Sequence, residues 1–262
     1  MPTYNSAATI SAALGSVLSQ TMPPAEMIVV DDHGGDDTLN IVEALRPAFE
    51  ARDIALRCIR LPANRGPASA RNGGMQVAVG SYIAFLDADD VWRDDKLALV
   101  TRQLNTFDGV CMFHAYTESS QFDELLAASP VEPVRLGMTA LLLHNRAQTS
   151  CVVIRRRPQV QFDEAMRYCE DYDLWLRMVE SGPALMLAGP ALTRLGRPQL
   201  SSGGLSGNRT KMRLGEMRVY FKYCARRWWP RVALLPILLT WSVIKHGRSA
   251  IRHHAPSAKQ GT

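Results

Sequence analysis

The sequence predicts an α/β protein with a mostly parallel, Rossmann-like central sheet flanked by helices. Three observations support this. Short apolar runs of strand length alternate with helical stripes through roughly the first half of the chain, and the connections between them are short. The run at residues 27–30 is continuously apolar, which is typical of a parallel strand buried on both faces. The length of 262 residues suits one domain of about 200 residues plus an appendage.

The first four elements are read from their periodicity. Residues 10–18 carry apolar side chains on one face at helical spacing, and the apolar strand at 27–30 follows. A turn rich in Gly and Asp then precedes a second helical stripe at residues 41–49. Residues 55–61 alternate apolar and polar side chains, which favours a strand.

The remaining elements become less regular toward the second half. A helix at residues 68–79 contains two adjacent glycines that indicate close packing, and a strand at 82–86 follows it. Residues 119–133 have weak patterning. The other expected elements are a helix at 97–104, strands at 110–113 and 151–154, and a helix at 171–179.

Charge is divided unevenly along the chain. From Gly207 onward there are twelve Lys or Arg residues and one acid, although the formal net charge of the whole is only +5. The basic residues surround an apolar stretch and are not interleaved with stacking aromatics, so we do not expect nucleic acid as a partner. We divide the chain into a domain at residues 1–205 and a basic amphipathic tail at 206–262.

The five cysteines are odd in number and widely spaced, with no CxxC pair and no histidine at zinc-ligand spacing. They fit buried thiols in a reducing compartment. No cleavable signal precedes the first helical pattern. We therefore expect a cytoplasmic protein.

Acidic residues follow two of the predicted strands. Asp87, Asp89 and Asp90 come directly after one, and Asp31 and Asp32 come after another. Open α/β sheets bind ligands at this edge, and grouped carboxylates suit a hard cation such as Mg²⁺ or Mn²⁺ on a diphosphate. The alternative is a solvated turn in which one aspartate caps the next helix.

Several ordered motifs resemble the signature of family 2 glycosyltransferases, and together they cover nearly all of residues 2–180. The first motif is Pro-Thr-Tyr-Asn at residues 2–5, followed by Ile-Val-Val-Asp-Asp at 28–32. The second is Asn-Arg-Gly-Pro-Ala-Ser-Ala-Arg-Asn-Gly-Gly at 64–74, which leads into Phe-Leu-Asp-Ala-Asp-Asp at 85–90. The third ends in Glu-Asp-Tyr-Asp-Leu-Trp-Leu-Arg at 170–177.

The resemblance implies a GT-A fold and sugar transfer from a nucleotide donor with inversion at the anomeric carbon. Asp89 would be the direct ligand of Mn²⁺ or Mg²⁺ on the diphosphate, and Asp90 is the less defined third acid. The residues implied in donor binding are Thr3, Tyr4, Asp32, Arg71 and Asp87.

The third motif supplies the candidate base. A carboxylate opposite the leaving group can take the proton of the attacking hydroxyl, and the resemblance gives this role to Asp171, with Glu170 supporting it or contacting the acceptor. Asp171 also precedes a helical stripe and so suits a helix cap, while Arg71 alone would read as a surface arginine paired with an acid. The family often has a histidine in a later loop, where this chain has Gly196, so no histidine role is carried over.

The tail has features of a membrane-surface helix. Paired tryptophans and arginines precede a mainly apolar run at residues 232–244. Its thirteen residues would span about 20 Å as a helix, too little for a hydrocarbon core of roughly 30 Å. We expect peripheral contact with the inner face of the cell membrane, against the alternative of a helix packed on the domain with its cations in water.

The family pattern places an apolar strand before Pro-Thr-Tyr-Asn, whereas here Met1 directly precedes Pro2. We therefore expect the first strand to be largely missing, either because the start is assigned too late or because the chain is a fragment. Three lost strand residues would cost roughly 5–9 kcal/mol.

The leading hypothesis is a metal-dependent, inverting glycosyltransferase of surface polysaccharide biosynthesis. Its donor would be a nucleotide sugar, with UDP slightly favoured, and its acceptor a saccharide or a lipid-linked sugar. The alternatives are a non-catalytic nucleotide-sugar-binding or assembly protein and a nucleotidyltransferase.

Overall fold

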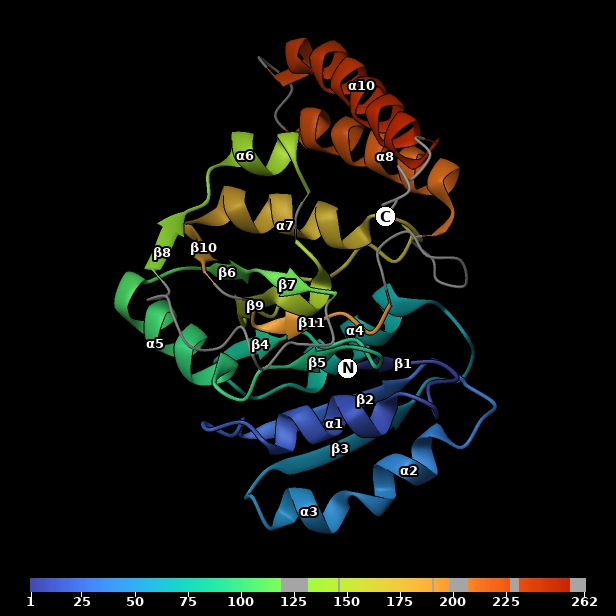
Figure 1. Ribbon diagram of the computed structural model, residues 1–262, viewed down its shortest axis with the longest axis vertical. Helices are drawn as coiled ribbons and strands as arrows, with labels where there is room; N and C mark the ends of the chain where they lie inside the picture. The colour runs from blue at the N-terminus through green and yellow to red at the C-terminus, as the bar shows by residue number, and fades with distance from the viewer. Residues whose placement is uncertain (119–131, 146, 190, 198–206, 227–230, 255–262) are drawn as a thin grey trace, which may run out of the picture.

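A parallel three-stranded sheet opens the fold. The computed structural model describes residues 1–118, 132–145, 147–189, 191–197, 207–226 and 231–254. Figure 1 shows its layers, with α2 and α3 at one end, the sheets in the middle and α8 and α10 at the other end. The N-terminal elements are β1 (Pro2–Thr3), α1 (Ile10–Leu18), β2 (Glu26–Asp31), α2 (Thr38–Ala44), α3 (Arg46–Glu50), β3 (Ala55–Arg60) and α4 (Pro67–Val77).

Strands β1, β2 and β3 pair in that order, and both ladders are parallel. The short first strand is two residues long, and the Met1 amino group donates to the Ile28 carbonyl at 2.8 Å. No ladder joins β1 to β4 within the described residues. The single helix expected at residues 41–49 is instead the pair α2 and α3, because Pro47, which has no N–H to donate, stands in the first turn of α3.

The second sheet is mixed. Its order is β4-β9-β6-β10-β8, in which only β6 and β10 pair in parallel. Residues 184–188 were not expected to form a strand, because a short apolar run fits a helix or a strand equally well. The elements of this region are β4 (Tyr82–Ala84), β5 (Val91–Trp92), α5 (Lys96–Phe107), β6 (Cys111–His114), β7 (Tyr116–Thr117), β8 (Glu132–Arg135), α6 (Met138–Leu143), the 3₁₀ turn η2 (Thr149–Cys151), β9 (Val152–Arg155), α7 (Glu170–Ser181), β10 (Ala184–Ala188) and β11 (Thr193–Arg194).

An aromatic cluster fixes α7 against the second sheet. The Trp175 ring, fully buried on α7, lies 5.6 Å from the Phe85 ring, 6.0 Å from the Phe113 ring and 6.0 Å from the Phe162 ring, centroid to centroid. Phe85 directly follows β4, so these contacts bring the start of α7 next to the end of β4. That junction carries the acids of the second and third sequence motifs.

Of the two C-terminal helices, the first packs on α7 and the second packs on the first (Figure 1). They are α8 (Arg209–Arg226), the short 3₁₀ turn η4 (Val232–Leu234) and α10 (Leu235–His254). Val219 and Tyr220 of α8 and Leu238 of α10 belong to the same buried cluster as Trp175. The boundary expected at residue 205 and most of the weakly patterned segment 119–133 lie outside the described residues. Among the helices described here, none has the length and apolar character needed to span a membrane.

The five cysteines all lie in described parts of the chain and are free thiols, four of them buried. Burial raises the pKa of the thiols of Cys111 and Cys151 to about 12. These two thiols are therefore protonated at neutral pH.

Candidate active site

The three acids after β4 form a tight turn with unequal exposure. The Asp90 N–H donates to the Asp87 carbonyl at 3.1 Å, and the Asp90 side chain is buried while the carboxylates of Asp87 and Asp89 are about one third exposed. The next helix, α5, begins only at Lys96. None of the three acids therefore caps it. Burial, followed by the charge of Asp87, raises the pKa of Asp90 to about 7 and also raises that of Asp89.

Arg71, on the buried face of α4, connects the second and third motifs. Its guanidinium donates to Asp87 Oδ1 at 2.8 Å and to Glu170 Oε1 at 3.1 Å, and it lies 5.5 Å from the centre of the Phe162 ring. The residue is 9% exposed, so the surface-arginine alternative is wrong. Burial alone would lower the pKa of Arg71, but the charges of Asp87 and Glu170 outweigh it and raise the pKa.

Asp32 is fixed at the start of α4. Its two carboxylate oxygens accept hydrogen bonds from the N–H groups of Arg65 at 2.8 Å and Gly66 at 2.7 Å. Gly66, with φ of 90°, adopts a left-handed conformation that favours glycine. Asp32 is 4% exposed, so binding of the donor's nucleobase would use the remaining lone pairs of these oxygens.

The neighbouring residues predicted to line the nucleotide pocket differ in exposure. Tyr4 is 53% exposed, whereas Thr3 is buried and its Oγ1 has no hydrogen-bond partner among the described residues. The Thr3 carbonyl accepts from the Asp32 N–H at 2.8 Å. The short first strand thus lies directly beside Asp32.

Glu170 and Asp171 begin α7, where the helix dipole favours carboxylates. The residue at the N-cap position is Cys169, so Asp171 is not the cap, although its Oδ1 accepts from the Tyr172 N–H at 2.7 Å. Burial, followed by the charge of Asp171, raises the pKa of Glu170 to about 7. Burial also raises the pKa of Asp171, against the opposing effect of Arg71. Both groups thus titrate closer to neutral pH than ordinary carboxyls.

Two hydroxyl residues that the sequence did not single out lie between these acids. Thr149 Oγ1 donates to Asp171 Oδ2 at 3.2 Å, and Ser150 Oγ donates to Asp90 Oδ2 at 2.5 Å. Ser150 Oγ also accepts from the Asp87 N–H at 2.9 Å. The only signal available in the sequence was a Thr-Ser pair just before an apolar strand, and this carries no periodicity.

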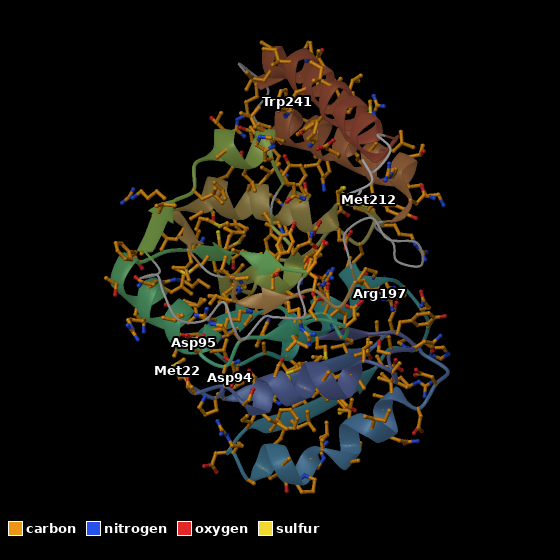
Figure 2. The ribbon with its side chains drawn as sticks, viewed as in Figure 1. Met22, Asp94, Asp95, Arg197, Met212 and Trp241 are labelled. Carbon is orange, nitrogen blue, oxygen red and sulfur yellow. The ribbon has the colours of Figure 1, made fainter. Side chains whose placement is uncertain are left out.

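Gly196 and Arg197, which follow β11, contact two of the three acids. The Gly196 N–H donates to Asp90 Oδ1 at 3.0 Å, and Arg197 Nε lies 3.2 Å from Asp89 Oδ2. A methyl group added to Gly196 would lie 1.7 Å from the Asp89 carbonyl oxygen, so only glycine permits this approach. Figure 2 labels Arg197 at mid-height of the molecule, well separated from Trp241 on α10.

The donor set suits a hard divalent cation bound with its substrate. No group of three or more His, Cys, Asp or Glu residues that could hold a metal by itself occurs in the described part of the chain. Mg²⁺ and Mn²⁺ bound with nucleotides need only one or two carboxylates, because the phosphates and water complete the shell. The Asp89 carboxylate is partly exposed, and burial followed by the charge of Asp87 raises its pKa, so it is the group that could serve as such a ligand.

Comparisons with known proteins identify the family of the chain. The model of the family "Glycosyl transferase family 2" matches residues 1–159. The chain is 31% identical over 180 residues to the Escherichia coli UDP-Glc:alpha-D-GlcNAc-diphosphoundecaprenol beta-1,3-glucosyltransferase WfaP, a match that spans 68% of each chain. It is 27% identical to the putative teichuronic acid biosynthesis glycosyltransferase TuaG of Bacillus subtilis, over 96% of this chain and 94% of that protein.

Solved structures support the same fold. Residues 1–349 of Staphylococcus aureus TarS in complex with UDP superpose with a TM-score of 0.68 at 19% identity, covering 94% of this chain and 70% of that one. The mannosyltransferase PcManGT of Pyrobaculum calidifontis, in complex with GDP-Man and Mn²⁺, gives 0.66 at 19% identity, covering 98% and 75%. The expected GT-A fold is confirmed. The family match over more than half the chain and the WfaP identity lead to one conclusion: this chain is a glycosyltransferase that belongs to family 2.

Proposed function

We propose that this glycosyltransferase moves a sugar from a nucleotide diphosphate donor to an acceptor hydroxyl with inversion, using Asp171 as the base. The observation that carries the proposal is the link through Arg71. One buried guanidinium holds both an acid after β4 and an acid at the start of α7. A donor-side and an acceptor-side carboxylate thus contact the same guanidinium, and a single displacement requires such proximity of the two sides.

The donor side consists of residues around the ends of β1, β2 and β4. Thr3 and Tyr4 line the nucleobase pocket, Asp32 accepts hydrogen bonds from the nucleobase, and Asp87 contacts the ribose. Asp89 holds Mn²⁺ or Mg²⁺, and Asp90 steadies the turn that presents it. When bound, the cation supplies charge neutralisation for the departing diphosphate.

The acceptor side is the first turn of α7. Asp171 accepts the proton of the attacking hydroxyl as the new glycosidic bond forms, and the donor diphosphate leaves from the opposite face of the sugar. Burial of Asp171 raises its pKa, which makes it a better proton acceptor than an ordinary aspartate. Glu170, paired with Arg71, orients the acceptor or supports the base.

Relatives support a UDP-sugar donor and a lipid-linked acceptor. WfaP is named for a UDP-Glc donor and a diphosphoundecaprenol acceptor, and a TarS structure contains UDP-GlcNAc. TuaG, ExoO of Rhizobium meliloti and AmsB of Erwinia amylovora are named for the biosynthesis of teichuronic acid, succinoglycan and amylovoran. We therefore assign this chain to surface polysaccharide synthesis at the cytoplasmic face of the cell membrane.

Contact with the membrane would use the exposed faces of α8 and α10. Large apolar side chains are exposed there beside basic residues, including Leu214 at 60% and Ile237 at 64%. Arg218 is also exposed on α8. Such a mixture suits the interface of an anionic bilayer. Pelleting with phosphatidylglycerol vesicles is expected for the wild type and is expected to fall for Leu214→Glu/Ile237→Glu. Equal pelleting of both proteins contradicts membrane contact.

Turnover and binding together test the catalytic proposal. Wild type is expected to hydrolyse or transfer a UDP-sugar, with UDP-glucose tried first, in the presence of Mn²⁺. Asp171→Asn should lose at least about 100-fold in kcat while still binding UDP, because a general base contributes about 10²–10⁴-fold. Asp108→Asn is the matched control, since Asp108 is exposed with φ of 46°, a conformation asparagine tolerates.

Each alternative predicts a different result. UDP binding without turnover in the wild type would support a non-catalytic binding protein. Formation of a nucleotide sugar from a sugar phosphate and UTP would indicate a nucleotidyltransferase. Full activity of Asp171→Asn would remove Asp171 from the role of base.

A further inference from the structure

The 3₁₀ turn η2 touches both groups of acids through two consecutive side chains. Ser150 Oγ accepts from the Asp87 N–H and donates to Asp90 Oδ2, at 2.9 Å and 2.5 Å. Thr149 Oγ1 donates to Asp171 Oδ2 at 3.2 Å. Adjacent Cα atoms are 3.8 Å apart, so a single peptide unit separates the contact to the donor side from the contact to the base.

Three side-chain hydrogen bonds hold the main chain of this turn in place. The Ser150 carbonyl accepts from Lys96 Nζ at 3.0 Å, Trp92 Nε1 at 3.1 Å and Thr193 Oγ1 at 3.2 Å. These donors come from two separate stretches of the chain, residues 92–96 and Thr193, and Ser150 and Lys96 are both fully buried. The Lys96 ammonium also lies 3.4 Å from the centre of the Trp92 ring. A carbonyl with three donors leaves the turn little freedom to shift.

We propose that Thr149 and Ser150 are a pair of positioning residues that fixes the distance between the donor-side acids and the base Asp171. This inference rests on the proposed function and extends it to two residues outside the donor and acceptor sides described above. Ser150 holds the turn of Asp87 and Asp90 in place, and Thr149 directs the Asp171 carboxylate. Misplacement of reacting groups by about 1 Å can cost 100-fold in rate, which gives such a pair a measurable effect.

Thr149→Val tests the contact to the base. Valine keeps the shape but cannot donate, and loss of a hydrogen bond to the carboxylate raises the pKa of Asp171. In the pH profile of kcat for UDP-glucose hydrolysis, the acidic limb should move to higher pH by about one unit, while UDP affinity stays unchanged. Thr149→Ser retains the hydroxyl and should restore the wild-type limb. An unmoved limb in Thr149→Val overturns this half of the proposal.

Ser150→Ala tests the contact to the donor side. The turn at Asp87 and Asp90 loses its support, so UDP affinity measured by calorimetry with Mn²⁺ should fall about tenfold. The acidic limb of kcat should stay in place. Should the alanine variant not fold, Ser150→Cys keeps similar volume with a weaker hydrogen-bonding group and should weaken UDP binding in the same direction. Wild-type UDP affinity in a folded variant overturns this half.

Matched controls separate positioning from general destabilisation. Thr106→Val and Ser181→Ala remove hydroxyls that donate to main-chain carbonyls on α5 and α7, at 2.9 Å and 2.8 Å, and the Ser181 hydroxyl also accepts from Arg157 Nη1 at 3.3 Å. Both should keep wild-type UDP affinity and the wild-type pH limb. If Asp171→Asn is inactive but Thr149→Val and Ser150→Ala behave as wild type, the positioning inference alone fails. If Asp171→Asn is fully active, the proposed base fails first.

Discussion

Replacement of Arg71 with methionine should destabilise the protein in a strongly pH-dependent way. Methionine fills much of the same space but leaves Glu170 without its buried cation. The side chains of Arg71 and Glu170 are 7% and 9% exposed, and loss of one partner of a buried pair typically costs about 3–5 kcal/mol. The Asp87 side chain is 33% exposed, so its pair with Arg71 adds less than about 1 kcal/mol after screening by solvent.

The pH dependence follows from the raised pKa of Glu170, about 7 in the folded protein against an ordinary value of 4.5. A carboxyl whose pKa is raised by folding contributes its full stabilisation at pH values below its pKa in the unfolded chain. It loses that stabilisation as the pH rises through its pKa in the folded protein. Removal of Arg71 raises the pKa of Glu170 further and extends that loss to higher pH. The free energy of unfolding of Arg71→Met should therefore fall below wild type by more near pH 8 than near pH 5.

Urea denaturation at both pH values measures the effect. The double variant Arg71→Met/Glu170→Gln removes both charges and should recover most of the stability lost near pH 8, to within about 2 kcal/mol of wild type. Two results would refute the reasoning. One is an equal loss at both pH values, and the other is a double variant as unstable as the single one.

Three further predictions concern neighbouring contacts. Gly196→Ala should displace its segment from Asp89 and lower Mn²⁺-dependent turnover at least tenfold, because the added methyl would lie 1.7 Å from a carbonyl oxygen; wild-type turnover contradicts the close approach. Arg197→Met should tighten Mn²⁺ binding to nucleotide-free protein severalfold by electron paramagnetic resonance, since the guanidinium pairs with Asp89 at 3.2 Å; weaker binding contradicts this competition. Asp173→Asn should lower the free energy of unfolding by about 3 kcal/mol near pH 7, because Asp173 is fully buried and pairs with Arg226 at 2.9 Å. The pKa of Asp173 is lowered, so its stabilisation is present above the unfolded value and the two proteins should converge as pH falls below about 4; a constant difference down to pH 3 would argue against this role.

The sequence determined much of the first half of the fold, because local rules act strongly there. The wholly apolar run at 27–30 was expected as a buried parallel strand and lies in β2, paired in parallel on both sides. The helical stripe at 171–179 lies within α7. The β10 strand was missed because an apolar run of five residues has no decisive period, and its partners β6 and β8 are distant in sequence.

The candidate site also contains residues that the sequence predicted and contacts that only the structure identified. Acids placed at a strand end and at a helix start can be read from motif and spacing, because each depends on residues close by in the chain. The burial of Arg71 between Asp87 and Glu170 depends on residues 16 and 99 positions away, so only tertiary packing decided it. The aromatic contacts around Trp175 bring β4 and α7 together, and that packing places Thr149, Ser150 and Gly196 against the acids. The sequence alone thus predicted the acids of the candidate site, whereas the tertiary structure decided which groups hold them, since hydrogen bonds between distant segments leave no periodic signal.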